Sequence, residues 1–196
     1  MISHLLRCVY VHVPKTGGHS IDRHFLEQGL VSVPCWHATA AKSIELLEGR
    51  PVYYMFATVR NPWDRLVSEY FWQGSDCDTQ IPTPWGNKTI RFEDYCRSDW
   101  SWYPPRERAD GHLSDQAHFL FDDRDRPLVN DIIRFENLQE GFDRVCQTLG
   151  LAPSQLPRLN ATRHEPYWRY YTDELVEEVA RRYARDIRLL GYEFGA

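Results

Sequence analysis

The segment "VYVHVPKTGGHS", Val9–Ser20, is the part of this sequence that is most informative about its fold. It overlaps a short run rich in β-branched and aromatic residues, Cys8–Val13, which predicts a buried strand that ends at Pro14. After Gly17-Gly18 the apolar residues fall at helical spacing, and the predicted helix ends at Gly29. A strand, a tight glycine loop and a helix in direct succession are typical of layered α/β proteins.

The same alternation continues along the 196 residues, which we expect to form a single domain, 1–196. Val52–Val59, "VYYMFATV", is almost continuously apolar and predicts a central parallel strand covered on both faces. A third strand is expected at Asp131–Phe135. Helices are expected at Ala38–Leu47, Asn61–Trp72, Ser114–Phe121 and Asn137–Leu149, with one long last helix from Thr172 to Leu190. The sequence therefore predicts an α/β fold of three layers, with a mainly parallel central sheet flanked by helices.

One region, residues 73–112, interrupts this regularity. The region is too long for a simple connection between two elements. Within it, the segment "RFEDYCRS" is compatible with a short helix. The region also contains Trp85, Trp100 and Trp102. Two readings stay open: an acceptor-side lid, or aromatic residues that only pack the loop onto the body.

Composition excludes several classes of protein. The formal net charge is −5, so the chain lacks the excess of positive charge that is typical of nucleic-acid-binding domains. Five scattered cysteines without a CxxC pair argue against a zinc site and for reduced thiols. The first apolar stretch, "MISHLLRCVYVHV", is too short and too polar for us to expect a signal peptide, and no apolar run has the length of a membrane span. We expect a cytoplasmic protein without integral membrane association.

The glycine loop has the chemistry of an anion site. Backbone N–H groups and the helix dipole converge where a strand passes into a helix, and Lys15 adds a positive charge. Thr16 and Ser20 add hydroxyl donors. The Walker pattern is absent because Lys15 precedes both glycines, and no convincing Walker B acid follows a strand. The loop therefore indicates a phosphate ester bound without metal, with an ordinary glycine turn as the alternative.

A second motif, "TVRNPWDRLVSEYFW", follows the central strand. Arg60 stands at the carboxyl end of that strand, where open α/β sheets bind ligands. Arg60 and Ser68 are about two helical turns apart, so a long Arg side chain and a hydroxyl can converge on one phosphate. Arg65 and Glu69 have the spacing of a surface ion pair, which is the reading we prefer for Arg65.

Together these motifs resemble those of sulfotransferases. "VHVPKTGGHSI" is similar to their 5′-phosphosulfate loop, and "VRNPWDRLVSEY" is similar to their 3′-phosphate motif. The resemblance continues through "RFENL" and the last segment to "LLGYEF", so it covers nearly the whole chain. It points to the carbohydrate-type, or family 2, sulfotransferase domain, whose fold is P-loop-like.

The resemblance implies a set of donor-binding residues. The loop residues that match are Lys15, Thr16, Gly17, Gly18, His19 and Ser20. Arg60 and Ser68 match the pair that binds the 3′-phosphate, and Arg163 lies where the family often has a basic residue. His19 departs from the pattern because the family often has Thr there, which removes a possible hydroxyl contact.

The resemblance also implies a reaction. A sulfuryl group would pass from PAPS (3′-phosphoadenosine 5′-phosphosulfate) to a hydroxyl or amine of a carbohydrate or small metabolite, leaving PAP (3′,5′-ADP). Lys15 would stabilise the phosphate that leaves, in place of a metal. His37, expected to open the helix before the central strand, is the preferred general base, although it could merely start that helix. His112 and His118 are reserves, and His12 is expected to serve structure.

Two other functions stay open. A P-loop small-molecule kinase would need a Walker lysine and a Mg²⁺ ligand, and neither is evident. A non-catalytic nucleotide-binding module could keep the same fold, although the presence of Lys15, Arg60 and Ser68 argues against it. No motif identifies the acceptor or the oligomeric state.

Overall fold

The structure is a computed structural model that describes residues 1–51, 53–73, 80–83, 86–99, 111–159 and 164–195. Contacts divide the chain into two compact units, each made of two segments. The first unit comprises Met1–Arg60 and Gln116–Asn160, and the second comprises Asn61–Asp115 and Ala161–Ala196. Within the described segments, no helix is both long and apolar enough to cross a membrane.

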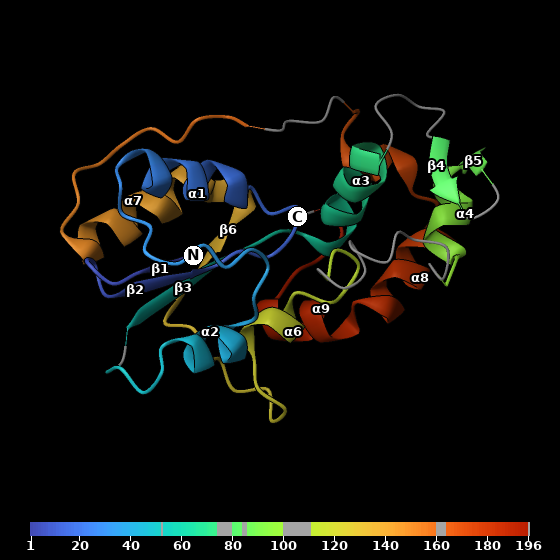
Figure 1. Cartoon of the computed structure of the whole chain (residues 1–196). Coiled ribbons are helices and arrows are strands. Elements are labelled where there is room, and N and C mark those ends of the chain that lie inside the picture. Colours follow the sequence, from blue (N-terminus) through green and yellow to red (C-terminus); the bar gives the residue numbers. More distant parts are fainter. Residues whose placement is uncertain (52, 74–79, 84–85, 100–110, 160–163, 196) are drawn as a thin grey trace. The chain divides into compact units, whose positions relative to one another are not determined.

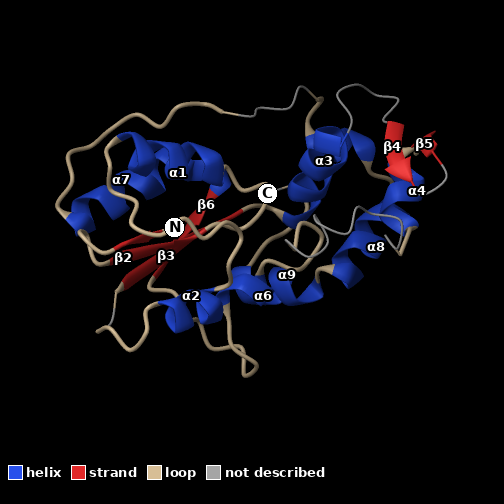
Figure 2. Cartoon of the chain, in the orientation of Figure 1, coloured by secondary structure: helices blue, strands red, loops and turns tan. Residues whose placement is uncertain are grey.

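The first unit is built on a four-stranded sheet. Its strands, in spatial order, are β1 (Ile2–Ser3), β2 (Cys8–Val11), β3 (Tyr54–Val59) and β6 (Asp131–Arg134). β2, β3 and β6 run parallel, whereas β1 is antiparallel to β2. Helices cover both faces of this sheet (Figures 1 and 2): α1 (Gly18–Glu27) and α7 (Leu138–Leu149) on one, α2 (Ala40–Leu46) and α6 (Ala117–Leu120) on the other.

The alternation of side chains along β2 explains this layering. Cys8 and Tyr10 point to the same face, where they pack with Phe25 of α1 and Phe142 of α7 in one buried cluster. All four residues of β2 are buried, as expected for a strand covered on both faces. The predicted three-layer α/β fold with a mainly parallel sheet is confirmed.

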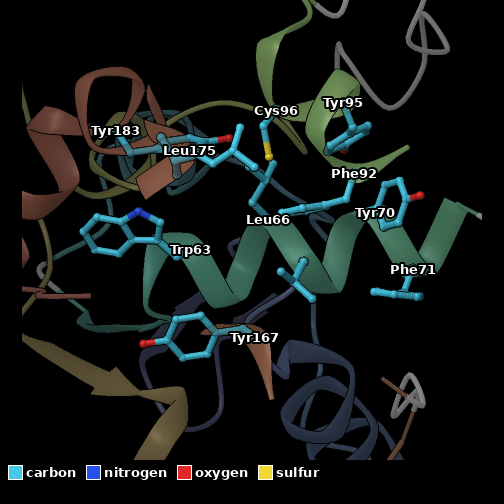
Figure 3. Packing of buried hydrophobic residues seen from close by; sticks show 12 residues of the cluster. Trp63, Leu66, Tyr70, Phe71, Phe92, Tyr95, Cys96, Tyr167, Leu175 and Tyr183 are labelled. Carbon is cyan, nitrogen blue, oxygen red and sulfur yellow. The ribbon is translucent and has the colours of Figure 1, made fainter. Parts of the chain in front are cut away.

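The second unit has an aromatic core between its helices, and it also contains a two-stranded hairpin. Its elements are α3 (Pro62–Gln73), β4 (Gln80–Thr83), β5 (Gly86–Thr89), α4 (Phe92–Arg97), the short 3₁₀ helix η2 (Tyr167–Tyr170), α8 (Asp173–Arg182) and α9 (Ala184–Leu190). Figure 3 shows how Leu66 and Tyr70 of α3 face Phe92 and Cys96 of α4 within this core. Most residues of α3 are buried, and they include the polar Arg65, Ser68 and Glu69 besides the apolar and aromatic side chains.

The prediction of one long last helix is wrong. Thr172 caps α8 as expected, since its hydroxyl accepts from Leu175 N at 3.4 Å. The helix ends at Tyr183, whose φ of −106° and ψ of 29° are not helical, and α9 begins after it. The buried Tyr183 hydroxyl donates to Leu113 O at 3.2 Å, a contact distant in sequence that accompanies the break.

The region expected to be irregular contains regular structure. β4 and β5 pair antiparallel, with Gln80 opposite Thr89, and α4 confirms the short helix predicted in "RFEDYCRS". The helix expected at Ser114–Phe121 is reduced to the four residues of α6. Trp85, Trp100 and Trp102, on which the lid reading rests, lie outside the described residues.

Candidate functional site

Three loops meet at the carboxyl edge of the sheet in the first unit. Because β2, β3 and β6 are parallel, the glycine loop, Arg60 and the 3₁₀ helix η1 (Phe135–Asn137) all follow strand ends at this edge. The Arg60 guanidinium carbon lies 4.1 Å from the centre of the Phe135 ring. Its Nη1 donates to Lys15 O at 3.3 Å. A cation is thus held against the loop that was expected to bind phosphate.

Gln116 fixes the backbone of Arg60. Its side-chain Oε1 accepts from Arg60 N, and its Nε2 donates to Arg60 O, both at 2.8 Å. Gln116 is fully buried, and Arg60 is only 8% exposed. The two bonds replace a missing strand neighbour and hold Arg60 at the strand end. No sequence motif pointed to Gln116, because its partner lies far away in the chain.

The glycine loop turns sharply into α1. Lys15 has φ 67° and Gly17 has φ 80°, both in the left-handed region. Gly17 caps α1 without any side-chain cap, so the N–H groups of the first turn are presented by backbone alone. Left-handed residues alternating with others are a feature of the backbone nests that bind anions. The backbone geometry of the loop therefore suits a phosphate. The two side chains expected to bind phosphate at this edge of the sheet, Lys15 and Arg60, are both positively charged.

Both glycines are also required by packing. A Cβ on Gly17 would lie 2.9 Å from Cδ2 of Leu138, besides being strained by the positive φ. A Cβ on Gly18 would lie 2.2 Å from Cδ2 of His12. The imidazole of His12 thus occupies the space beside the helix start. A larger residue at either position would have to displace the side chain next to it.

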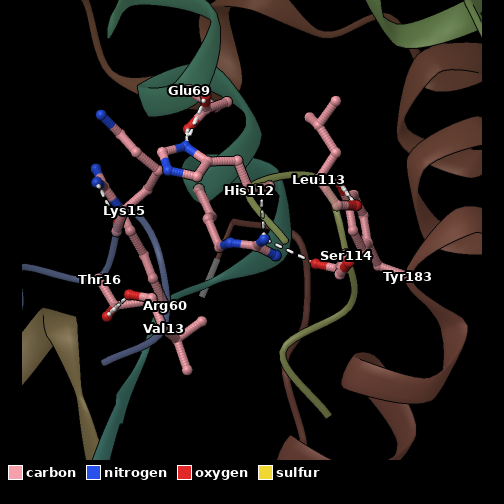
Figure 4. A network of polar contacts seen from close by, with 10 residues as sticks. Val13, Lys15, Thr16, Arg60, Glu69, His112, Leu113, Ser114 and Tyr183 are labelled. Carbon is pink, nitrogen blue, oxygen red and sulfur yellow. Dashed lines mark hydrogen bonds and ion pairs between the residues drawn. The ribbon is translucent and has the colours of Figure 1, made fainter. Parts of the chain in front are cut away.

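The Thr16 side chain points into the sheet. Its hydroxyl donates to Val13 O at 2.8 Å, a bond drawn in Figure 4. Since that proton is committed, Thr58 donates to Thr16 at 2.6 Å, and Tyr10 in turn donates to Thr58 at 2.6 Å. Burial raises the pKa of Tyr10 well above its usual value, so this hydroxyl keeps its proton. The hydroxyl of Thr16 therefore fixes the loop to the sheet. Thr16 can contact a donor phosphate through its backbone N–H.

Histidines gather around His12, just beyond β2. His12 is 1% exposed, and its Nδ1 lies 2.6 Å from Oδ2 of Asp22, one turn into α1. The ring of His37 lies edge-on to that of His12 at 4.9 Å between centres, and the ring of His19 does so at 5.2 Å. Trp36 completes the group at 5.9 Å from His19. His12 is buried and contacts Asp22, and sequence reasoning missed both this partner and the meeting of three histidines.

His37 does not open a helix. The N-cap of α2 is Thr39, whose hydroxyl accepts from Lys42 N at 3.1 Å. His37 lies two residues earlier in a turn, with a left-handed φ of 53°. It is half-buried, and its ring packs edge-on against that of His12. The expected position at a helix N-terminus is therefore wrong. His37 lies near the start of α1, because its ring contacts His12, which fills the space beside Gly18.

In the second unit, Ser68 lies on α3 and is 5% exposed. The reading of Arg65 as a surface ion pair is wrong, because Arg65 is 2% exposed and donates to His112 O at 2.8 Å and to Ser114 O at 2.7 Å. Figure 4 shows Glu69 accepting from His112 Nδ1 at 3.1 Å. His112 is therefore tied into the second unit's polar network.

Two candidate residues remain, His118 and Arg163. His118 is exposed on α6 in the first unit. Arg163 lies outside the described residues. Among the residues that the structure does describe, no group of three His, Cys, Asp or Glu side chains is arranged to hold a metal ion.

Similarity to known proteins supports the interpretation of these motifs at the level of the family. No curated protein matches the chain. A family model described as the sulfotransferase family matches residues 1–193, which include the glycine loop, Arg60 and Ser68. The match spans both compact units and nearly all 196 residues. The chain therefore belongs to the sulfotransferase family, of the family 2 type.

Proposed function

We propose that this sulfotransferase uses PAPS as its donor and transfers the sulfuryl group to a hydroxyl or amine of a carbohydrate or small-metabolite acceptor, with PAP as the second product. The family implies sulfuryl transfer in general and a small-molecule acceptor. The observation that carries the donor proposal is the buried guanidinium of Arg60, held against the backbone of Lys15 at the carboxyl edge of the sheet. A donor with phosphates at both its 3′ and 5′ positions needs such a second cation.

The residues at this edge fit the donor. The left-handed loop and the first turn of α1 suit the 5′-phosphosulfate, as does the charge of Lys15. Arg60 suits the 3′-phosphate, because a guanidinium binds phosphate through paired hydrogen bonds. We assign Gly17, Gly18, His19 and Ser20 to the loop contacts, Ser68 to the 3′-phosphate, and Arg163 to a further contact.

The reaction needs one base and one stabilised leaving group. The acceptor oxygen attacks sulfur, the bond between sulfur and the bridging phosphate oxygen breaks, and its electron pair stays on the phosphate. Lys15 and the loop N–H groups stabilise the charge that develops there, so no metal is required. The acceptor hydroxyl gives its proton to the imidazole of His37, which then passes it to solvent.

Thermal stability in the presence of two nucleotides tests the donor assignment. At one hundred times its Kd, 3′,5′-ADP should add about 2.7 kcal/mol of stability in EDTA, or roughly 5–10 °C in Tm for a chain of this size. 5′-ADP at the same concentration should add much less, because it lacks the phosphate that Arg60 binds. Arg60→Ala should remove this preference, whereas Arg144→Ala, which changes a half-exposed arginine of the same unit, should keep it.

The comparison is made as a ratio of the two nucleotide responses within each variant, so a lower baseline stability does not affect it. An equal response of the wild-type protein to both nucleotides would overturn the 3′-phosphate assignment. A preference that survives in Arg60→Ala would show that another residue binds that phosphate. A response to 5′-ADP that appears only with Mg²⁺ would favour the kinase alternative.

A further inference from the structure

A cavity of about 260 Å³ lies beside α1, entirely within the first unit. None of the residues described so far as donor ligands lines it except His19. Its lining is Met1, His19, Asp22, Arg23, Leu26, Val31, Pro34, Cys35, Trp36 and Leu159. Most of these are apolar. The volume is slightly below the range of roughly 300–1,000 Å³ usual for ligand pockets, so it suits a small molecule or one end of a larger one.

The cavity follows one face of the helix that begins at the glycine loop. His19, Asp22, Arg23 and Leu26 stand at positions i, i+3, i+4 and i+7 of α1, which share a face. The opposite face, through Phe25, belongs to the buried core. His19 lies in the first turn of α1, directly after the glycines. The cavity therefore has in its wall the residue that directly follows the loop proposed to hold the reacting end of the donor.

Three large apolar residues of the cavity are open to solvent. Leu26 and Trp36 are each 59% exposed, although large apolar side chains are usually buried. Leu159 is also exposed. Gathered around one cavity, exposed apolar side chains of this size mark a binding site more often than a chance surface. The indole of Trp36 and the imidazole of His19, 5.9 Å apart, offer flat faces to a ring.

The cavity has few polar groups, and most of them already make a hydrogen bond or an ion pair. Arg23 pairs with Glu27 at 2.5 Å, and Oδ2 of Asp22 contacts His12. The other oxygen of Asp22, Oδ1, is buried and has no hydrogen-bond partner within the described part of the chain. Burying a polar group without a partner is unfavourable. A ligand with many hydroxyls would leave most of them unpaired in this cavity, whereas a ligand with one hydroxyl would not.

We propose that this cavity binds the acceptor, and that the acceptor is a small molecule with a flat apolar ring system and a single hydroxyl rather than a polyhydroxylated sugar. The proposal rests on the proposed function, because it assigns the acceptor of that reaction. In this proposal His19 lies between the glycine loop and the acceptor, as part of the wall of the cavity. It also departs from the carbohydrate acceptor that the family resemblance implies.

The test uses 2-naphthol as a flat probe with one hydroxyl and N-acetylglucosamine as a sugar probe, in the presence of 3′,5′-ADP. Calorimetric titration should show saturable binding of 2-naphthol that the sugar does not compete with. Leu26→Trp should weaken 2-naphthol binding roughly tenfold or more, because the larger side chain fills the cavity. Ile44→Trp is the matched control, since Ile44 is a 45% exposed apolar residue on α2 of the same unit and does not line the cavity.

The thermal response to 3′,5′-ADP is measured on the same samples. If that response is present but 2-naphthol fails to bind, binds equally to Leu26→Trp, or is displaced by the sugar, the acceptor proposal is overturned and the donor proposal stands. If the response to 3′,5′-ADP is absent, the proposed function fails and the acceptor role fails with it. Transfer of the sulfuryl group to 2-naphthol, lost in Leu26→Trp and kept in Ile44→Trp, is the result expected.

Discussion

Lys15→Met is expected to lower kcat roughly 10²–10³-fold, because removing one preorganised donor to developing charge usually costs that much. Methionine keeps an unbranched side chain that is one atom shorter, and it removes the charge. The contact from Arg60 reaches the backbone oxygen of Lys15, so the substitution leaves it in place. The loss should therefore come from the transition state, where the leaving phosphate gains charge, and the KM for the donor should change much less.

The chain offers a matched control for this substitution. Lys42 is an exposed lysine of α2 whose partner is the equally exposed Glu45. Lys42→Met should leave kcat unchanged. Steady-state rates with labelled PAPS measure both variants. A kcat for Lys15→Met within a few-fold of the wild-type value would mean that backbone N–H groups alone stabilise the leaving group, and the role assigned to Lys15 would be wrong.

His37→Asn is expected to lower kcat roughly 10²–10⁴-fold, which is the usual contribution of a general base. Asparagine is chosen because it tolerates the left-handed backbone at this position and cannot act as a base. The variant should still respond to 3′,5′-ADP as the wild-type protein does, since His37 is assigned to the acceptor proton and not to the donor.

His118→Asn serves as the control, because His118 is an exposed histidine of the same unit and should not affect turnover. Rates are followed over a range of pH with saturating donor. If His37→Asn keeps wild-type turnover and pH dependence, His37 is not the base. His19 would then be the next histidine to change, because its exposed ring lines the acceptor cavity.

Elements with strong local patterns were predictable from the sequence. The continuous apolar run at Val52–Val59 gave β3 within two residues, and the run at Cys8–Val13 gave β2. Gly29 and Gly150 marked the ends of α1 and α7 well, because glycine readily adopts the left-handed conformation that ends helices. The α/β layering followed from the order of these elements.

Features decided by distant contacts were not predictable. The break at Tyr183 accompanies a hydrogen bond to Leu113, and the helical spacing across it showed no interruption. Arg65 has the spacing of a surface pair with Glu69, yet it is buried against backbone oxygens that lie far away in the sequence. Spacing along one helix cannot show what packs against that helix.

The same limit applied to the candidate site. The motifs placed Lys15 and Arg60 at strand ends, and the parallel sheet brought them together. Gln116 and Asp22 were missed because each acts through one partner and belongs to no motif. A polar residue one turn beyond a glycine loop, on the face that a strand-end histidine can reach, is the signal that would have found Asp22.

Transfer of label from two donors to one panel of hydroxylated acceptors tests directly which group this protein transfers. The protein is incubated with sulfur-labelled PAPS in EDTA and, separately, with ATP labelled in its terminal phosphate in the presence of Mg²⁺. We predict that sulfur label moves to an acceptor with one equivalent of 3′,5′-ADP formed, and that phosphorus label does not move. Movement of phosphorus label alone, or of neither label, would contradict the assignment of this chain as a PAPS-dependent sulfotransferase.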